Sequence, residues 1–238
     1  MLKEALSYLV SLKDNKTYEF HGDVYSDREL HRVAPYVARP SGIEVNGLDS
    51  IVKLVRSELS LFENPPLFIR VEGPRRVSVF SALDSDMKRD DLYRAVCDAP
   101  DFRAGWREQE AAIIELRSAF IPNEGTGYLL DLLSRICKED SVSSEDNGVS
   151  QTVSARQGIS LKNYERLKTR IPLIPYRTFT EVEQPESEFI LRLDENGRVG
   201  LIEADGGKWK MTAKERICEY FETALKEEIE KAAVVVMM

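Results

Sequence analysis

The chain has 238 residues, of which 42% are hydrophobic and 31% are charged. This balance is that of an ordinary globular protein and excludes an intrinsically disordered chain. The formal net charge of -8 and the isoelectric point near 5.1 disfavour sequence-independent binding to nucleic acid or to an anionic membrane, because both need a large basic surface. A local basic face is still compatible with these totals.

Apolar residues at spacings of three and four predict amphipathic helices along the chain. The expected helices cover residues 2–13, 48–59, 103–121, 128–136 and 212–231. The third rests on an apolar stripe formed by Trp106, Ile113, Leu116 and Phe120. The fourth follows a break at 125–127. The last begins at a capping box, in which Thr212 and Glu215 satisfy each other's free backbone donors.

Runs of β-branched and aromatic residues predict the strands. The clearest signals are two hairpins, one over 67–80 around Gly73-Pro74 and one over 188–204 around Asn196-Gly197. In the second hairpin we expect alternate residues to share one face, namely Phe189, Leu191 and Leu193. Further strands are expected at 17–20, 92–96, 152–156, 173–174 and 176–180.

Several segments are less clear. Pro172 and Pro175 bracket the strand at 173–174 and favour an edge position, because proline cannot donate to a ladder of hydrogen bonds. The segment 161–170 fits either a strand edge or a short helix. Asp205-Gly206-Gly207 is expected to form a turn before the last helix.

These elements together predict an α+β fold, in which a mostly antiparallel sheet built from hairpins carries about five amphipathic helices. We expect one domain over 1–238. A polar run of small residues at 139–150 offers an alternative division into 1–138 and 151–238, or a long hairpin connection.

The residues needed for common catalytic chemistries are scarce. The two histidines, His21 and His31, have acidic neighbours, but a metal site needs three or more ligands at a defined spacing. No GxSxG, GxGxxG or P-loop pattern occurs, which disfavours a serine hydrolase and a phosphate-cradling loop. We expect no cofactor and no metal, and we lean against an enzyme.

Three cysteines, Cys97, Cys137 and Cys218, lie far apart and form no CxxC pair. This arrangement argues against a disulfide framework and a zinc knuckle, so we expect buried free thiols in a reducing cytoplasm. No stretch approaches the ~18 apolar residues of a membrane span, and the N-terminus lacks the apolar core of a signal peptide. We therefore expect no membrane partner and a cytoplasmic location.

One acidic group keeps an enzymatic alternative open. Asp194, Glu203 and Asp205 loosely resemble the acids of a metal-dependent phosphodiesterase, and Lys208 follows closely. The spacing departs from that pattern, because residue 205 is an aspartate where the pattern has lysine. The simpler interpretation is that these acids shape turns or face solvent.

A cluster of basic residues surrounds the first hairpin and consists of Arg70, Arg75, Arg76, Lys88, Arg89 and Arg94, with Phe68, Phe80 and Tyr93 interleaved. Such a cluster can stack bases and follow the phosphates of single-stranded nucleic acid. The alternative is a solvated sheet face balanced by neighbouring acids, which the acidic total favours.

The apolar end of the chain, 233–238, contains Val234, Val235 and Val236. Three adjacent valines favour a strand. This strand could complete the sheet, or it could form an oligomer contact, because an exposed apolar patch commonly marks an interface.

A block in the second half of the chain resembles a known family. Its residues are Leu173, Pro175-Tyr176-Arg177-Thr178-Phe179, Glu181-Val182, Gln184-Pro185, Ser187, Phe189, Arg192, Glu203-Ala204-Asp205-Gly206-Gly207 and Trp209, with Asp146 and Gly148-Val149-Ser150-Gln151 upstream. This pattern, over about residues 100–225, is similar to the YfdQ-like group of uncharacterised bacteriophage and prophage proteins. The resemblance implies a phage or prophage origin and a bacterial host cytoplasm, and it implies no mechanism.

The leading hypothesis from the sequence is a non-catalytic accessory or assembly protein that acts through protein contacts, including self-association. Single-stranded nucleic-acid handling by the basic hairpin surface is the alternative. A metal-dependent phosphodiesterase is the third hypothesis.

Overall fold

The computed structural model describes residues 17–20, 23–26, 39–62, 65–84, 87–100, 102–135, 143–146, 151–157, 160–166, 168–194 and 198–238. The chain divides into two compact units, 1–39 and 40–238. In the first unit, β1 (Thr17–Phe20) pairs antiparallel with β2 (Asp23–Ser26), which confirms the strand expected at 17–20. The helix expected over 2–13 lies outside the described residues, as do His21, His31 and Cys137.

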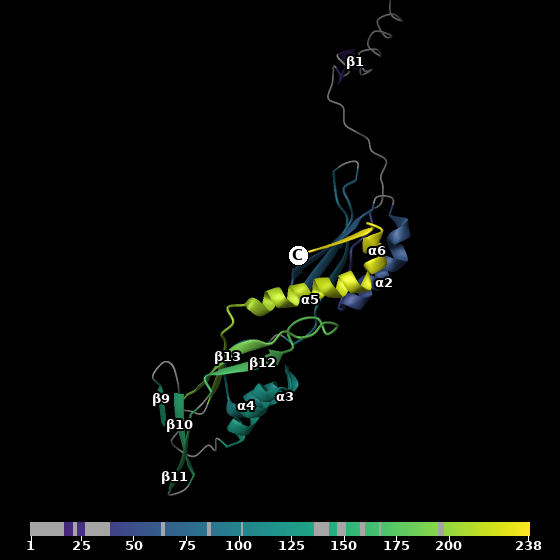
Figure 1. Ribbon diagram of the computed structural model, residues 1–238. Coiled ribbons are helices and arrows are strands. Elements are labelled where there is room, and N and C mark those ends of the chain that lie inside the picture. The colour runs from purple at the N-terminus through teal and green to yellow at the C-terminus, as the bar shows by residue number, and fades with distance from the viewer. Residues whose placement is uncertain are drawn as a thin grey trace, which may run out of the picture. The chain divides into compact units, whose positions relative to one another are not determined.

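Residues 40–238 form an α+β fold with mostly antiparallel sheets, as expected (Figure 1). Sheet I has the strand order β15-β4-β5-β6-β3, and Sheet II has the order β7-β14-β13-β12-β8. A three-stranded sheet has the order β11-β10-β9. The described helices are α2 (Leu48–Glu58), α3 (Gln109–Ser118), α4 (Glu124–Arg135), α5 (Lys208–Ala224) and α6 (Lys226–Glu230), with a short 3-10 turn at Leu59–Leu61.

The strands of Sheet I are β3 (Ile43–Val45), β4 (Leu67–Gly73), β5 (Arg76–Phe80), β6 (Asp91–Val96) and β15 (Val234–Met237). The strands of Sheet II are β7 (Gly105–Arg107), β8 (Phe120–Ile121), β12 (Arg170–Pro175), β13 (Ser187–Leu193) and β14 (Val199–Glu203). The third sheet contains β9 (Ser143–Asp146), β10 (Gln151–Gln157) and β11 (Ser160–Arg166).

Sheet I is built around the first predicted hairpin. Strands β4, β5 and β6 form an antiparallel meander. Strand β15 then pairs in parallel with β4, and β3 pairs in parallel with β6. The apolar end of the chain is therefore a final strand of the sheet, which confirms one of the two interpretations given for it.

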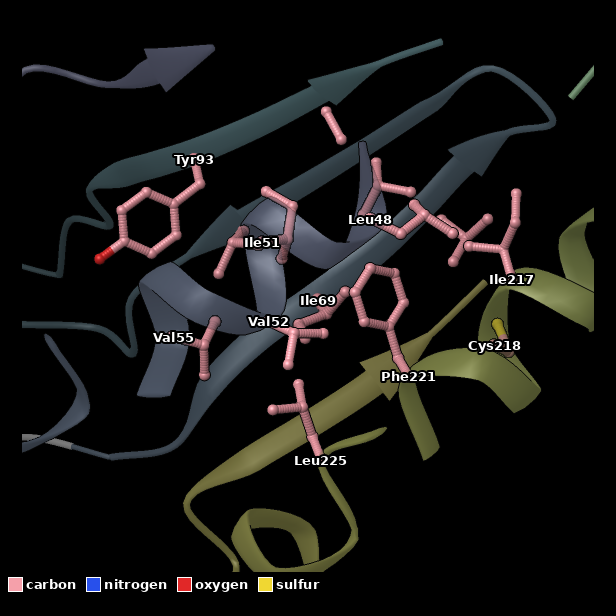
Figure 2. Close-up of a cluster of buried hydrophobic side chains, with 14 of the residues drawn as sticks. Leu48, Ile51, Val52, Val55, Ile69, Tyr93, Ile217, Cys218, Phe221 and Leu225 are labelled. Atoms are coloured by element: carbon pink, nitrogen blue, oxygen red, sulfur yellow. The ribbon is translucent and has the colours of Figure 1, made fainter. Parts of the chain in front are cut away.

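One face of Sheet I is covered by two helices that are far apart in the sequence. Helix α2 contributes Ile51 and Val55, and helix α5 contributes Phe221, to a core that includes Ile69 of β4 (Figure 2). Each of these side chains is fully buried. Burying a large aliphatic or aromatic side chain stabilises a fold by about 1.5–3 kcal/mol, so the helices hold this face firmly.

Sheet II is organised around the second predicted hairpin. Strands β13 and β14 pair antiparallel, and Phe189, Leu191 and Leu193 share the buried face, as expected. Leu116 of α3 and Leu129 of α4 pack in the same core. The turn residues 195–197 lie outside the part of the chain that the structure describes.

The loop 176–186 connects β12 to β13 of Sheet II, but two of its side chains belong to the core of Sheet I. Phe179 and Val182 are buried among the side chains of α2, α5 and β4. The Glu181 carboxylate also reaches helix α2, where it accepts a hydrogen bond from the backbone amide of Leu48 at 2.7 Å. This carboxylate caps the helix, because the preceding Gly47 has no side chain for that purpose.

The side chain of Gln184 holds this loop in shape. Its Oε1 atom accepts hydrogen bonds from the backbone amides of Arg177 and Thr178, at 3.0 and 3.1 Å. Its Nε2 atom donates to the carbonyl oxygen of Phe179 at 2.9 Å. Gln184 is buried, so these bonds are shielded from water and fix the path of the loop between the two cores.

Several local expectations are wrong. Helix α3 begins at Gln109 rather than at 103, because Trp106 lies on strand β7 and Phe120 lies on β8. Trp106, Ile113 and Phe120 are spaced by seven, but they lie on a strand, a helix and a strand in succession. Residues 176–180 form a loop, because Gln184 binds backbone groups that a strand would use for pairing.

Helix boundaries differ as well. Thr212 lies inside α5, which starts at Lys208, so it does not begin a capping box. Helix α5 ends at Ala224, and α6 follows as a separate short helix. Helix α4 includes 125–127 rather than following a break there. Strand β12 lies between β13 and β8, so it is not an edge strand, but β8 pairs only with Ile174 and Pro175, and Pro172 is paired on the β13 side alone.

The segment 161–170 is largely strand β11, and the strand expected at 152–156 is confirmed as β10. The division of domains at 139–150 stays a prediction, although strand β9 lies within that run. Among the described helices, none has the length and apolar character that a membrane crossing requires.

Two glycines in the first turns of α4 provide a matched test of packing between α4 and β12. A Cβ atom on Gly125 would lie 2.1 Å from the carbonyl oxygen of Pro172, whereas nothing lies within 4 Å of a Cβ atom on Gly127. We expect Gly125→Ala to lower the free energy of unfolding by roughly 2 kcal/mol through overpacking. Gly127→Ala should be neutral or stabilising by up to about 1 kcal/mol, because alanine favours a helix.

Urea denaturation of both variants would measure these changes. Equal effects at the two positions would show that the α4–β12 contact does not constrain residue 125.

Candidate functional site

The face of Sheet I that points away from the helices gathers arginines and two phenylalanines. Side chains alternate across a strand, so the buried Leu67, Ile69 and Val71 of β4 leave the intervening positions on the other side. We call this side the open face, and it carries Phe68, Arg70, Glu72, Arg76, Ser78, Phe80 and Arg94.

The two phenylalanines of the open face lie at one end of two neighbouring inner strands of the sheet. Phe68 of β4 pairs with Phe80 of β5, and their rings stack with centroids 5.5 Å apart and planes 14° apart. The Arg89 guanidinium lies 4.8 Å from the Phe68 ring centroid and 5.4 Å from that of Phe80. An exposed loop therefore places a cation over a stacked aromatic pair.

The charges of the open face are only partly balanced. Arg70 donates to the Glu72 carboxylate at 2.7 Å, and this hydrogen bond is the main reason why the pKa of Glu72 is lowered, although burial acts in the opposite direction. Arg76 and Arg94 are exposed, and neither is within ion-pair distance of an acid in the described part of the chain, although Arg76 helps to lower the pKa of Glu72 and Arg94 is the cross-strand partner of Glu44. These two guanidinium groups are available to a partner.

A small polar residue lies between these arginines. Ser78 of β5 is the cross-strand partner of Arg70 on β4 and of Arg94 on β6. Only 6% of the surface of Ser78 is exposed. Its hydroxyl is close enough to Glu72 to contribute to the lowered pKa of that carboxyl, but it forms no hydrogen bond of acceptable geometry with the described residues. A cavity of about 150 Å³ opens beside Ser78 and Arg94.

Two residues of the predicted basic surface do not join the open face. The Arg75 guanidinium donates to the carbonyl oxygens of Cys97 at 3.0 Å and Ala99 at 2.7 Å, so it fixes the chain after β6. Tyr93 points to the core side, where its hydroxyl donates to Glu58 at 2.6 Å. Burial and this contact raise the pKa of Tyr93.

Of the predicted surface, Arg70, Arg76 and Arg94 come together with Phe68 and Phe80, as the interleaved pattern indicates. The sequence analysis missed Ser78. The only signal for it is a single small hydroxyl residue in a strand of valines, 76–80.

The three acids of the phosphodiesterase hypothesis do not come together. Asp194 accepts from Arg198 at 2.6 Å at the turn end of the second hairpin. Glu203 lies at the other end of the same hairpin, because it pairs with Phe189. In the part of the chain that the structure describes, no group of three or more acidic, histidine or cysteine side chains could hold a metal ion.

Glu203 and Asp205 instead belong to a buried cluster around Arg177. The Arg177 guanidinium donates to Glu203 at 2.9 Å and to the Ser187 hydroxyl, and it lies 4.0 Å from the Trp209 ring centroid. Burial lowers the pKa of Arg177 to about 10, while the two carboxylates act in the opposite direction, so the guanidinium is charged at neutral pH. The sequence analysis placed Arg177 on a strand and did not anticipate a buried charge.

Asp205 orders the turn that precedes α5. Its carboxylate accepts hydrogen bonds from the backbone amides of Gly207 at 2.9 Å and Trp209 at 3.2 Å, and from the Ser187 hydroxyl. Burial raises the pKa of Asp205, but these hydrogen bonds together outweigh it and the pKa is lowered. Gly206 and Gly207 have φ values of 66° and 81°, which confirms the predicted turn.

The two cysteines within the described residues, Cys97 and Cys218, are free and buried, as expected. Val234, the first residue of the predicted oligomer contact, is buried in the core of Sheet I, whereas Val235 is 37% exposed.

Comparisons of the chain with protein-family models, with curated proteins and with solved structures found no match. The resemblance to YfdQ-like phage and prophage proteins is therefore still a prediction. Identification of the neighbouring genes would test it.

The buried Arg177 cluster and the exposed ion pair of Arg170 with Glu188 can be compared for their contributions to the free energy of unfolding. We expect Arg177→Met to lower the free energy of unfolding by about 3 kcal/mol, because Glu203 and Asp205 would lose a buried partner. Arg170→Ala should cost less than about 1 kcal/mol, because its ion pair with Glu188 is exposed on both sides.

Chemical denaturation at pH 7 measures both changes. A loss for Arg177→Met no greater than that for Arg170→Ala would contradict a stabilising role for the cluster.

Proposed function

We propose that this chain acts by binding rather than by catalysis, and that the open face of Sheet I binds single-stranded nucleic acid. The stacked pair of Phe68 and Phe80, surrounded by arginines on the exposed side of a sheet, is the observation that carries this proposal. We therefore favour single-stranded nucleic-acid binding over the protein-contact role that was the leading hypothesis from the sequence.

The aromatic pair fits unpaired bases. Bases of a single strand are free to stack on aromatic side chains, and this contact contributes about 1–3 kcal/mol per base without requiring a particular sequence. Phe68 and Phe80 are partly exposed, and Arg89 lies over them from a loop rather than from the sheet. The Arg89 guanidinium is too close to the Phe68 ring for a base to fit between them, so a base must displace it in order to stack on the rings.

The arginines fit the backbone of the same strand. Arg76 and Arg94 have no internal ion pair among the described residues, so their charge is available to phosphates. The net charge of -8 would oppose non-specific binding to a duplex over a wide surface. A small basic face with stacking rings favours a single strand, whose bases are accessible, over a duplex.

A fluorescently labelled single-stranded oligonucleotide tests this proposal by anisotropy at about 50 mM salt. We expect binding that weakens as salt rises, and we expect the Phe68→Ala, Phe80→Ala double variant to lose at least tenfold in affinity, because it removes the stacking surface. Arg117→Ala is a suitable control, because Arg117 is exposed on α3, a helix that packs in the core of Sheet II and contributes no residue to the open face.

The proposal fails if no oligonucleotide binds at low salt. It also fails if the double variant binds as tightly as the unaltered chain, or if a duplex of the same sequence competes equally well.

Self-association through β15 is the second candidate function. Strand β15 is at the edge of Sheet I, and an edge strand presents unpaired backbone groups that can pair with another chain. Val235 and Met238 are exposed there, at 37% and 56%. This arrangement favours a dimer formed by pairing of two β15 edges.

Light scattering after size-exclusion chromatography tests this second candidate. We expect a dimer at micromolar concentration that Val235→Lys converts to a monomer, because a charged edge resists pairing. Val234 is unsuitable for this purpose because it is buried in the core. A monomer at all concentrations would exclude this function.

A further inference from the structure

We infer that the open face contains a built subsite for one phosphate group, formed by Ser78 between Arg76 and Arg94. The inference rests on the proposed function, and it identifies where the backbone of the bound strand is held. The ligand class is a phosphodiester within a single-stranded nucleic acid.

The subsite is built around the buried hydroxyl of Ser78. Ser78 is only 6% exposed, and its Oγ atom forms no hydrogen bond of acceptable geometry with the described residues. A buried hydroxyl without a partner costs free energy, and such a group commonly binds a water, an ion or a ligand. The neighbouring Glu72 carboxylate, whose pKa the Ser78 hydroxyl helps to lower, is already engaged by Arg70. Its neighbours on the same strand, Val77 and Val79, face the core, which leaves Ser78 on the open side.

Two exposed guanidinium groups, those of Arg76 and Arg94, lie near Ser78. Arg94 is the direct cross-strand partner of Ser78, so their Cα atoms are separated by about 5 Å. Arg76 precedes Ser78 by two residues on β5 and shares its face, at about 7 Å. Two long guanidinium side chains can therefore converge on an anion that accepts a hydrogen bond from the Ser78 hydroxyl.

Three acidic residues also lie near Ser78. Glu72 is already paired with Arg70, so its charge is largely offset. Glu44 and Asp91 line the cavity beside Ser78 and Arg94, and they oppose an anion. Glu44 is also the cross-strand partner of Arg94, and Glu72 interacts with Arg76 as well as with Arg70. The subsite therefore holds a single phosphate at Ser78, between Arg76 and Arg94, rather than a run of phosphates across the sheet.

The subsite lies on the same strand as one ring of the aromatic pair. Phe80 lies two residues after Ser78 on β5, on the same face. The distance between these positions is about 7 Å, so the two positions are close enough to bind a base and a phosphate of the same or a neighbouring nucleotide. A base stacked on Phe80 would thus be attached to a backbone whose neighbouring phosphate reaches Ser78.

Inorganic phosphate tests the subsite independently of the bases. Nuclear magnetic resonance of the labelled full-length chain would follow backbone amides during titration with sodium phosphate, with sodium chloride at matched ionic strength as the control. We expect phosphate-specific shifts at residues 76–78 and 94, and we expect Ser78→Ala to reduce them. The Phe68→Ala variant should retain them, because the rings do not contact the phosphate.

Oligonucleotide affinity then places the subsite within the proposed function. We expect Ser78→Ala to weaken binding about tenfold, because it removes a hydrogen bond to a charged group. Arg76→Ala with Arg94→Ala should lower the steepness of the salt dependence by about 0.7 per phosphate lost. Asp91→Asn should tighten binding about twofold to threefold, since it removes an opposing charge.

The outcomes separate the two proposals. If oligonucleotides bind through Phe68 and Phe80 but Ser78→Ala changes neither affinity nor phosphate-induced shifts, the subsite is wrong and the proposed function stands. If phosphate shifts residues 76–78 but no oligonucleotide binds, the proposed function is wrong and the anion site stands. An acidic peptide that displaces the oligonucleotide at equal concentration would overturn the assignment of a phosphodiester ligand.

Discussion

Helices cover only one side of strands β4, β5 and β6, and the proposed binding surface depends on this constraint. Helices α2 and α5 bury Leu67, Ile69, Val77 and Val79. Alternation of side chains then obliges the intervening residues to face outward. The same packing that stabilises the sheet thus assembles the arginines and phenylalanines of the open face from three strands and a loop.

The core of Sheet I also contains side chains from the loop that connects two strands of Sheet II. The loop 176–186 places Phe179 in the core under Sheet I and caps α2 with Glu181. Gln184 and the Arg177 cluster hold that loop through buried hydrogen bonds. Many residues of the predicted phage-family pattern lie in this loop, where they stabilise the fold, which leaves the open face as the candidate for binding.

Local patterns predicted much of this fold, because the information they need is local. Alternation and turn residues located both hairpins, and the buried positions Phe189 and Leu191 follow from it directly. The basic cluster was predicted for the same reason, since Arg70 and Arg76 lie within one hairpin. Long-range interactions were not predictable. Arg75 binds carbonyls beyond β6, and Gln184 turns an alternating segment into a loop, neither of which leaves a periodic signal.

Photochemical crosslinking is the most direct test of the central claim, because it reports where a single strand lies on the protein. An oligonucleotide with photoreactive pyrimidines would be irradiated with the full-length chain, and the adducts would be located by mass spectrometry. The account predicts adducts in the peptides that contain Phe68 and Phe80. Adducts confined to other surfaces, such as α3 or the β15 edge, would contradict it.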